Sequence, residues 1–242
     1  MKQFFGMSQR GDLNEAVRGL SAPQFIMLFS NTDQFERHVR ELEGLYPGVP
    51  SIGCIGMSYD TRIVEKGVGV IAFSGGVSAA ADVLEEVSVM PVKYIDRLKR
   101  DMNKVSASQD NTICIDFCAG NDACVLTTIY TVLKRRGISL VGGTGDAGKV
   151  SANGRVYEDA VAYALVKNQN GRVKAYKENI YHQLEQHRFI ASKTDKSRYI
   201  IGALNGRPAR QVYQEILHIS EQEIQTRTFQ NPFGKLNGDD TC

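Results

Sequence analysis

The sequence predicts an α/β fold with two pseudo-symmetric β-α-β-α-β-β units, each a mixed sheet covered by helices. The first observation is a repeated glycine-rich segment, which reads VPSIGCIGMS at residues 49–58 and ISLVGGTGDA at residues 138–147. The second is that each copy leads into an apolar stretch typical of a strand, at residues 67–73 and 159–165. An internal repeat indicates related structural units, and glycine turns at strand ends expose backbone to a ligand. We therefore expect a cleft built from both halves.

The first unit covers about residues 1–83. Its predicted strands are at residues 3–7, 25–29, 51–54, 68–73 and 77–83. Asp12 is placed to cap a first helix, with Glu15 three residues later completing a capping box. A second helix should begin at about Thr32, because Phe35 and Val39 start an apolar face at helical spacing. This helix makes the connection between strands 25–29 and 51–54, so these two strands should run parallel.

The second unit covers about residues 84–180. Its predicted strands are at residues 87–90, 112–117, 138–141, 160–166 and 173–180. Helices should follow the first two of these strands, and the second helix should run from Asp122 to Arg136. Residues 173–180 should form a hairpin with the preceding strand through the polar turn 168–171. Periodicity alone leaves residues 77–83 ambiguous between helix and strand, and we predict a strand because their counterpart, residues 173–180, alternates.

The repeat ends near Tyr181. We expect a first domain over residues 1–198, then a linker helix and the incomplete start of another domain over residues 199–242. In the second segment a strand should end near Leu204, and the turn at residues 205–208 should open an amphipathic helix. Too little sequence follows residues 231–234 to bury a core, so exposed edges there favour a mobile tail or a homodimer.

Composition predicts a cytoplasmic protein of ordinary polarity. The net charge of +2 gives no strong attraction to nucleic acid or anionic lipid. No apolar run approaches the roughly 20 residues of a membrane span, and the first seven residues do not resemble a signal peptide. The five cysteines have no disulfide-framework spacing, which fits a reducing compartment. We expect no membrane contact from this segment.

Residues 143–149 (GTGDAGK) match seven positions of a phosphate-binding P-loop. The eighth position is Val150, where the motif needs a hydroxyl for Mg²⁺. A P-loop must also open a helix, and residues 151–154 read as a turn. These failures argue against nucleotide hydrolysis.

The cysteines and histidines predict no metal site and no cofactor. Cys114, Cys118 and Cys124 are spaced four and six apart, unlike the paired ligands of a structural zinc site. His182 and His187 are five apart, which misses the helical spacing of a metal pair. Cys54 lies in a glycine turn, where a thiol can be exposed and reactive. A metabolite enzyme that uses Cys54 or the 143–149 loop therefore stays an alternative.

Two predicted helix starts, residues 30–33 and 120–122, each follow a buried strand. Free backbone amides at a helix start favour an anion such as a carboxylate. The acidic side chains Asp33 and Asp122 compete for the same amides as helix caps. Both a ligand contact and simple capping remain open.

Together these segments resemble the FIST domain, a bacterial sensory module. The motifs that carry the resemblance are residues 28–30 (LFS), the turn at 53–54 (GC), residues 141–146 (VGGTGD), residues 204–209 (LNGRPA), residues 212–213 (VY) and residues 231–234 (NPFG). The N-terminal part of the family corresponds to about residues 1–198, and the remainder resembles the beginning of its C-terminal part. The sequence departs from the family at residues 55–59, where apolar residues suggest a more apolar pocket.

The resemblance implies a cytoplasmic sensor for a small ligand, such as an amino acid or related metabolite. It also implies an output module, for example a chemotaxis transducer or histidine kinase, and brings no catalytic residues. We therefore expect signalling without chemistry, with a protein-interaction module as a further alternative. Ligands of open α/β sheets lie beyond the carboxyl ends of the strands. The site residues predicted on this basis are Ser30, Asn31, Cys54, Gly56, Met57, Gly143, Thr144, Gly145 and Asp146, with Asp146 as an anchor for an ammonium group.

Overall fold

The chain forms two units in a computed structural model, Met1–Ala175 and Tyr176–Cys242. The structure describes residues 1–56, 58–59, 62–63, 66–90, 92–120, 122–176, 180–184, 186–195, 200–234, 236–237 and 240–241. The first unit ends before residue 198, the boundary expected from the sequence. The reason is that β13 (Ala191–Asp195) pairs with β14 (Ile200–Leu204), which places both strands in the second unit.

The first sheet contains the first half of the repeat. Its strand order is β1 (Lys2–Ser8), β6 (Val68–Ser74), β2 (Phe25–Ser30), β3 (Ser51–Ile55), β10 (Lys149–Ala152) and β11 (Arg155–Glu158). β2 and β3 run parallel, which confirms the prediction, and the other neighbours are antiparallel. The chain passes from β2 to β3 through η1 (Thr32–Gln34) and α2 (Phe35–Leu45).

The short helix α1 (Leu13–Ala16) follows β1. The side chain of Asp12 accepts hydrogen bonds from the backbone N–H groups of Asn14 and Glu15, so the predicted cap is confirmed. The reciprocal half of the predicted capping box is wrong. The N–H of Asp12 donates to Ser8 Oγ, and the carboxylate of Glu15 accepts from the same hydroxyl.

The second sheet repeats the same pairing pattern. Its strand order is β7 (Val77–Leu84), β12 (Val161–Asn168), β8 (Thr112–Cys118) and β9 (Ser139–Thr144). Only β8 and β9 are parallel. α3 (Ile95–Lys104) connects β7 to β8, and α4 (Asp122–Lys134) connects β8 to β9.

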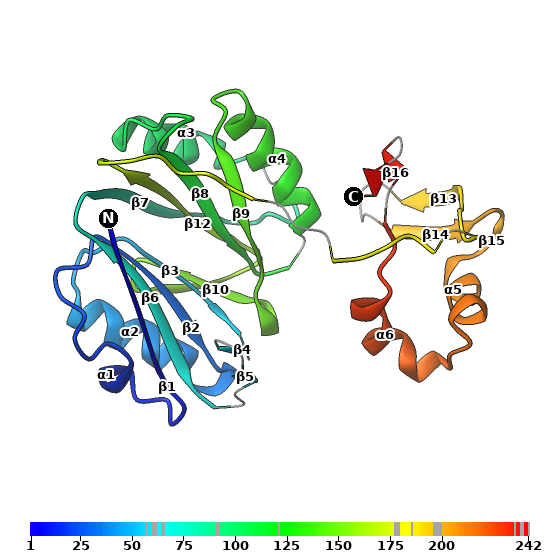
Figure 1. The fold of residues 1–242 in the computed structure, drawn as a ribbon, viewed down its shortest axis with the longest axis horizontal. Coiled ribbons are helices and arrows are strands. Elements are labelled where there is room, and N and C mark those ends of the chain that lie inside the picture. Colours follow the sequence, from blue (N-terminus) through cyan, green and yellow to red (C-terminus); the bar gives the residue numbers. More distant parts are fainter. Residues whose placement is uncertain are drawn as a thin grey trace. The chain divides into compact units, whose positions relative to one another are not determined.

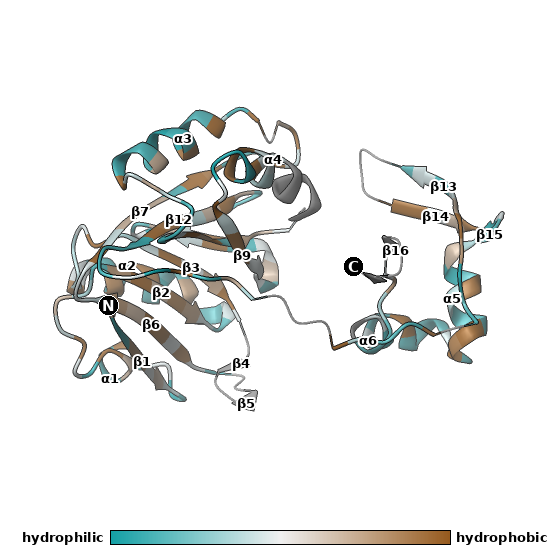
Figure 2. Ribbon diagram, turned by 45° about the horizontal axis from the view of Figure 1, so that its top comes forward, coloured by the Kyte–Doolittle hydropathy of each residue, from teal (hydrophilic) through white to brown (hydrophobic). Residues whose placement is uncertain are grey.

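Four layers result, with the two sheets face to face and helices on both outer sides (Figure 1). α1 and α2 pack on the first sheet through a cluster that includes Leu13, Leu28 and Val39. α3 and α4 pack on the second sheet through a cluster that includes Leu98 and Leu133. The central cluster lies between the two sheets. The first sheet contributes Phe25, Met27, Ile52, Cys54, Val150 and Ala152, and the second contributes Val77, Val83, Phe117, Ala162, Ala164 and Val166. Figure 2 shows the hydrophobic residues concentrated on these strands.

The repeat is present, but its phase differs from the prediction. β7 pairs with β12 as β1 pairs with β6, so residues 77–84 open the second half of the repeat instead of closing the first half. The strand predicted at residues 87–90 is wrong, because residues 87–89 form a turn and the N–H of Val87 donates to the carbonyl of Asp159 instead. Residues 173–176 and 180 are not in a strand, so the predicted hairpin with 173–180 is wrong in its described part. The physical reason is that β12 already has β7 and β8 on its two edges, which leaves no edge for another strand.

A hairpin from the second half completes the first sheet. β10 pairs with β3, and β11 pairs with β10, although both strands follow β9 in the sequence. The loop 145–148 therefore leads from the second sheet to the first. A smaller hairpin of β4 (Ser58–Tyr59) and β5 (Arg62–Ile63) follows β3 at the corresponding position of the first half.

The second unit begins with a sheet of three short strands, β13, β14 and β15 (Arg207–Pro208). The amphipathic helix α5 (Ala209–Leu217) begins directly after the predicted turn and buries Val212 and Tyr213. The remaining elements are η3 (Glu221–Glu223), α6 (Ile224–Gln230), β16 (Leu236–Asn237) and β17 (Asp240–Thr241).

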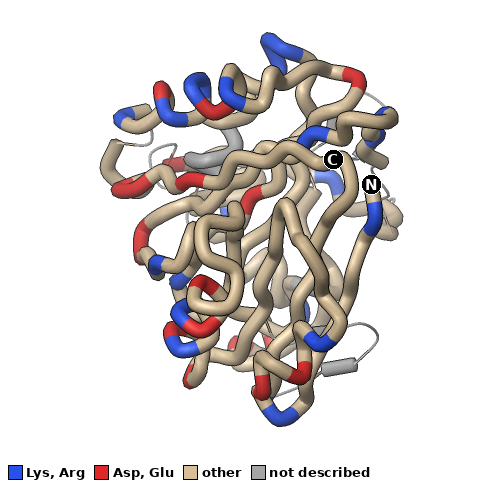
Figure 3. The backbone as a smooth tube through the Cα atoms, turned by 90° about the vertical axis from the view of Figure 1, so that its left-hand side faces the viewer, with Lys and Arg blue, Asp and Glu red and all other residues tan. Residues whose placement is uncertain are grey.

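Charged residues lie mainly on helices and loops. In Figure 3 the blue and red segments are interspersed, and the central strands are mostly free of both. Within the described residues, no helix is long and apolar enough to cross a membrane.

Candidate functional site

The carboxyl ends of the two parallel strand pairs are equivalent. Ser30 of β2 pairs with Ile55 of β3, and Cys118 of β8 pairs with Thr144 of β9. One residue later in each half, a glycine N–H donates back across the pair. Gly56 donates to Ser30 O at 3.0 Å, and Gly145 donates to Cys118 O at 2.9 Å. The two glycine-rich segments therefore occupy corresponding positions, as the repeat predicts.

Two of the repeated glycines serve the sheets. Gly53 lies opposite Leu28, and Gly142 lies opposite Asp116. A Cβ added to Gly53 would approach the Leu28 carbonyl oxygen to 3.0 Å, and one added to Gly142 would overlap the Asp116 carbonyl oxygen. Close strand packing thus explains these glycines without a ligand.

Two phenylalanines meet where the halves face each other. Phe29 precedes Ser30, and Phe117 precedes Cys118, so the two rings are related by the repeat. Their centroids are 5.4 Å apart and their planes are inclined by 71°, an edge-to-face contact. Sequence reasoning did not select either residue. The signal was available, because an aromatic residue precedes the last position of both buried strands.

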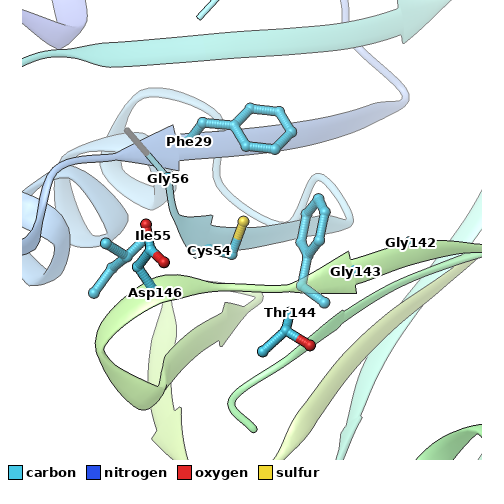
Figure 4. A pocket seen from close by; sticks show the side chains of 9 residues that line it. Phe29, Cys54, Ile55, Gly56, Gly142, Gly143, Thr144 and Asp146 are labelled. Atoms are coloured by element: carbon cyan, nitrogen blue, oxygen red, sulfur yellow. The ribbon is translucent and has the colours of Figure 1, made fainter. Parts of the chain in front are cut away.

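A cavity of about 450 Å³ opens at this meeting point. Its lining residues come from both halves: Phe29, Cys54, Ile55 and Gly56 from the first, and Phe117, Gly142, Gly143, Thr144 and Asp146 from the second (Figure 4). The structure therefore brings together five nominated residues, Cys54, Gly56, Gly143, Thr144 and Asp146. Pockets of this size suit small organic ligands.

The lining is related by the repeat but differs chemically between the halves. Cys54 corresponds to Gly143, and Ile55 corresponds to Thr144. In Figure 4 the sulfur of Cys54 points toward the ring of Phe29, and Asp146 lies beside Ile55. A Cβ added to Gly56 or Gly143 would have no atom within 4 Å, so bare backbone borders open space at both positions.

Gly145 allows close packing of the chain next to the cavity. A Cβ at this position would lie 2.9 Å from Cys54 Cβ, so only glycine lets the 145–148 loop pack closely on β3. Met57, which is one residue past Gly56, lies outside the described residues.

Ser30 and Asn31 lie near the cavity but do not line it. Ser30 is fully buried, and its hydroxyl lies 2.7 Å from His38 Nδ1. Asn31 is also buried, and its N–H donates to the carbonyl of Gly67 at 3.1 Å. Within the helix start at residues 30–33, where free amides were expected to favour an anion, the Asn31 amide is therefore already paired. At the other predicted helix start, Asn121 lies outside the described residues.

His38 completes a buried network beneath the site. Its Nε2 lies 3.0 Å from the carbonyl oxygen of Gly11 and 3.2 Å from Nη2 of Arg37. Its Nδ1 lies 2.7 Å from Ser30 Oγ, and the Ser30 hydroxyl also donates to the carbonyl of Asn31 at 3.1 Å. Burial lowers the pKa of His38, Arg37 lowers it further, and the Gly11 carbonyl and Glu41 oppose the change. His38 is therefore held as a neutral imidazole.

This burial predicts a pH-dependent stability. In the unfolded chain His38 takes up a proton near its ordinary pKa of 6.5, whereas the folded protein does so only at lower pH. The free energy of unfolding should therefore fall as pH drops below about 6.5, by at most about 1.4 kcal/mol per pH unit from this group. Urea unfolding at about pH 7.5 and pH 5.5 measures the loss. His38→Gln should reduce the difference between the two pH values, and an unchanged difference would contradict this role for His38.

The Cys54 thiol is not activated. Burial and the nearby charge of Asp146 raise its pKa to about 12. At neutral pH the sulfur is therefore protonated, which is the weakly nucleophilic form. Cys114 and Cys118 are also buried as free thiols, and Cys118 Sγ lies 3.4 Å from Asp116 Oδ2.

The 143–149 segment does not have P-loop geometry. It contains η2 (Asp146–Gly148), and strand β10 follows instead of a helix. Lys149 Nζ lies 2.9 Å from Glu36 Oε1 and 3.5 Å from Glu158 Oε1. These contacts raise the pKa of Lys149, the bond to Glu36 most of all. Its positive charge is therefore balanced by carboxylates. Among the residues that the structure describes, no group of three or more His, Cys, Asp or Glu side chains is arranged to hold a metal ion.

Comparison with known proteins gave one family and a distant structural likeness. A family model described as the FIST N domain matches residues 24–207. A crystal structure of cyanuric acid hydrolase from A. caulinodans is similar to this chain with a TM-score of 0.36 and 11% sequence identity. That match covers 69% of this chain and 71% of the other. No curated protein matches the chain.

Proposed function

Because this chain belongs to the FIST N domain family, whose members are signal-transduction sensory domains, we propose that it binds a small metabolite in the cavity between its sheets. An amino acid or a related small molecule is the proposed ligand class. The occupied domain signals to a fused or associated output module, such as a chemotaxis transducer or a histidine kinase.

The observation that carries this proposal is that both halves of the repeat contribute residues to the cavity lining. Phe29 and Cys54 come from the first half, and their counterparts Phe117 and Gly143 come from the second. A ligand in this position contacts both halves at once. It therefore stabilises whichever arrangement of the two sheets contacts it best, and this is how a binding event shifts a conformational population.

The environments of Cys54 and Lys149 favour binding over catalysis. Cys54, the nucleophile of the alternative enzyme hypothesis, is a buried thiol with its pKa raised to about 12. Lys149, the cation of the alternative glycine-loop hypothesis, is paired with Glu36 and Glu158. Neither residue has the environment of an activated catalytic group.

Thermal unfolding of the whole chain with a panel of amino acids, amines and small carboxylates tests the proposal. A true ligand at about 100 times its dissociation constant should add about 2.7 kcal/mol and raise Tm by about 5–10 °C. Gly143→Val should abolish this shift, because its side chain enters the open space of the cavity. Gly44→Ala is the matched control. This glycine of α2 is equally open but lies outside the lining, so the shift should persist.

Two results would contradict the proposal. The first is a panel without any stabilising compound, or one whose effect survives Gly143→Val. The second is conversion of a stabilising compound into product, with loss of turnover in Cys54→Ala or Lys149→Ala. That outcome would support the enzyme instead.

A further inference from the structure

The lining of the cavity carries one kind of charge. Asp146 is an exposed carboxylate, and it is the one ionisable acid or base, apart from the Cys54 thiol, among the described lining residues. The other lining residues are aromatic, aliphatic, glycine or threonine. An ammonium group can donate a charge-assisted hydrogen bond to such a carboxylate. An anionic ligand meets repulsion there.

Three backbone amides beside the cavity are not available to an anion. The sequence predicted that free amides at the helix starts, residues 30–33 and 120–122, could face the carboxylate of a ligand. In the structure the amide of Asn31, at the first of these starts, is used within the protein, and so are the amides of the glycines that follow the two strand ends. The N–H groups of Asn31, Gly56 and Gly145 donate to Gly67, Ser30 and Cys118, at 3.1, 3.0 and 2.9 Å respectively.

The apolar part of the lining is shared by both halves. Phe29 and Phe117 form their edge-to-face pair within it. Cys54 adds a neutral sulfur that points toward Phe29, and Asp146 lies to the other side, beside Ile55 (Figure 4). The cavity thus has an apolar pole made by the rings and an acidic pole made by Asp146.

We propose that this cavity selects organic monoamines with an apolar body and requires no carboxylate on the ligand. The ammonium group bonds to Asp146, and the body packs on Phe29 and Phe117. The inference rests on the proposed binding function and narrows its ligand class from amino acids to amines.

Three probes with one common body test the selection. 2-Phenylethylamine carries the ammonium group alone, phenylalanine carries both charges, and 3-phenylpropanoate carries the carboxylate alone. Isothermal titration calorimetry with the whole chain at neutral pH should show that 2-phenylethylamine binds at least about tenfold more tightly than phenylalanine. The reason is that Asp146 repels the carboxylate of phenylalanine, whereas 2-phenylethylamine has no carboxylate. 3-Phenylpropanoate should not bind measurably.

Variants of Asp146 assign the selectivity to its charge. Asp146→Asn should weaken 2-phenylethylamine binding about tenfold or more, and Asp146→Glu should restore much of it, because the carboxylate is kept. Asp110→Asn is the matched control. Asp110 is an exposed carboxylate before the start of β8, at the end of that strand away from the cavity, so its loss should leave the affinity unchanged.

The outcomes separate this inference from the function on which it rests. Tighter binding of phenylalanine or 3-phenylpropanoate, with loss in Gly143→Val, would overturn the amine inference and leave ligand sensing intact. Equal binding of 2-phenylethylamine to wild type and Asp146→Asn would also overturn it. Failure of every probe and of the whole metabolite panel would overturn both.

Discussion

Gly142→Ala should destabilise the protein by about 3 kcal/mol or more, a large effect for one added methyl group. The new Cβ would overlap the backbone carbonyl oxygen of Asp116 on β8, and it would also meet the Asp116 side chain. A backbone atom of a central strand cannot move aside as a flexible side chain does. β8 and β9 would have to separate at the point where they position the cavity.

Gly143→Ala provides the matched control one residue further along β9. Its Cβ would meet no atom within 4 Å, and its backbone is not in the left-handed region. The free energy of unfolding should therefore stay within about 0.5 kcal/mol of wild type. Urea denaturation of both variants measures the contrast. Equal stability of Gly142→Ala and Gly143→Ala would show that the close approach to Asp116 does not limit the fold.

Phe117→Ala should cost about 3–5 kcal/mol of stability. Phe117 is 8% exposed and belongs to the cluster that joins the two sheets, so the substitution leaves a void between them. Its edge-to-face contact with Phe29 should add about 0.5–1.5 kcal/mol beyond area burial. Both effects act where the two halves meet.

A double-mutant cycle separates these contributions. Phe29→Leu, Phe117→Leu and the double variant keep most of the apolar volume and remove the ring pair. Their urea unfolding free energies should be non-additive by roughly the coupling just given. Additive values would mean that the rings fill space without a specific contact.

Local signals in the sequence were sufficient for most elements. The apolar spacing of residues 35–42 predicted α2, the unbroken apolar run at 25–29 predicted β2, and Asp12 marked the start of α1. The site residues Cys54 and Gly143 could be predicted from the topology. A helical crossover makes its two strands parallel, so their carboxyl ends meet at one edge, and Cys54 and Gly143 reach that edge in their respective halves.

The repeat itself was visible in the sequence, but its phase was not. Periodicity leaves residues 77–83 ambiguous between helix and strand. Only the pairing of β7 with β12 shows that they form a strand and that this strand opens the second half of the repeat. The pairing of β10 with β3 was equally hidden, because it joins residues that are about 100 positions apart, such as Ile52 and Ala152. Strand pairing at such separation depends on which edges remain open in the folded sheets.

The sequence by itself determined the α/β class, the order of most elements and the repeated glycine turns. Only the tertiary structure decided that Phe29 and Phe117 meet, that the close approach of β8 requires a glycine at position 142, and that the Ser30 hydroxyl contacts His38. The physical reason is that periodicity and capping act within a few residues, whereas a cavity forms where two sheets come together. Which side chains border it depends on the register and facing of strands that the chain brings together from its two halves.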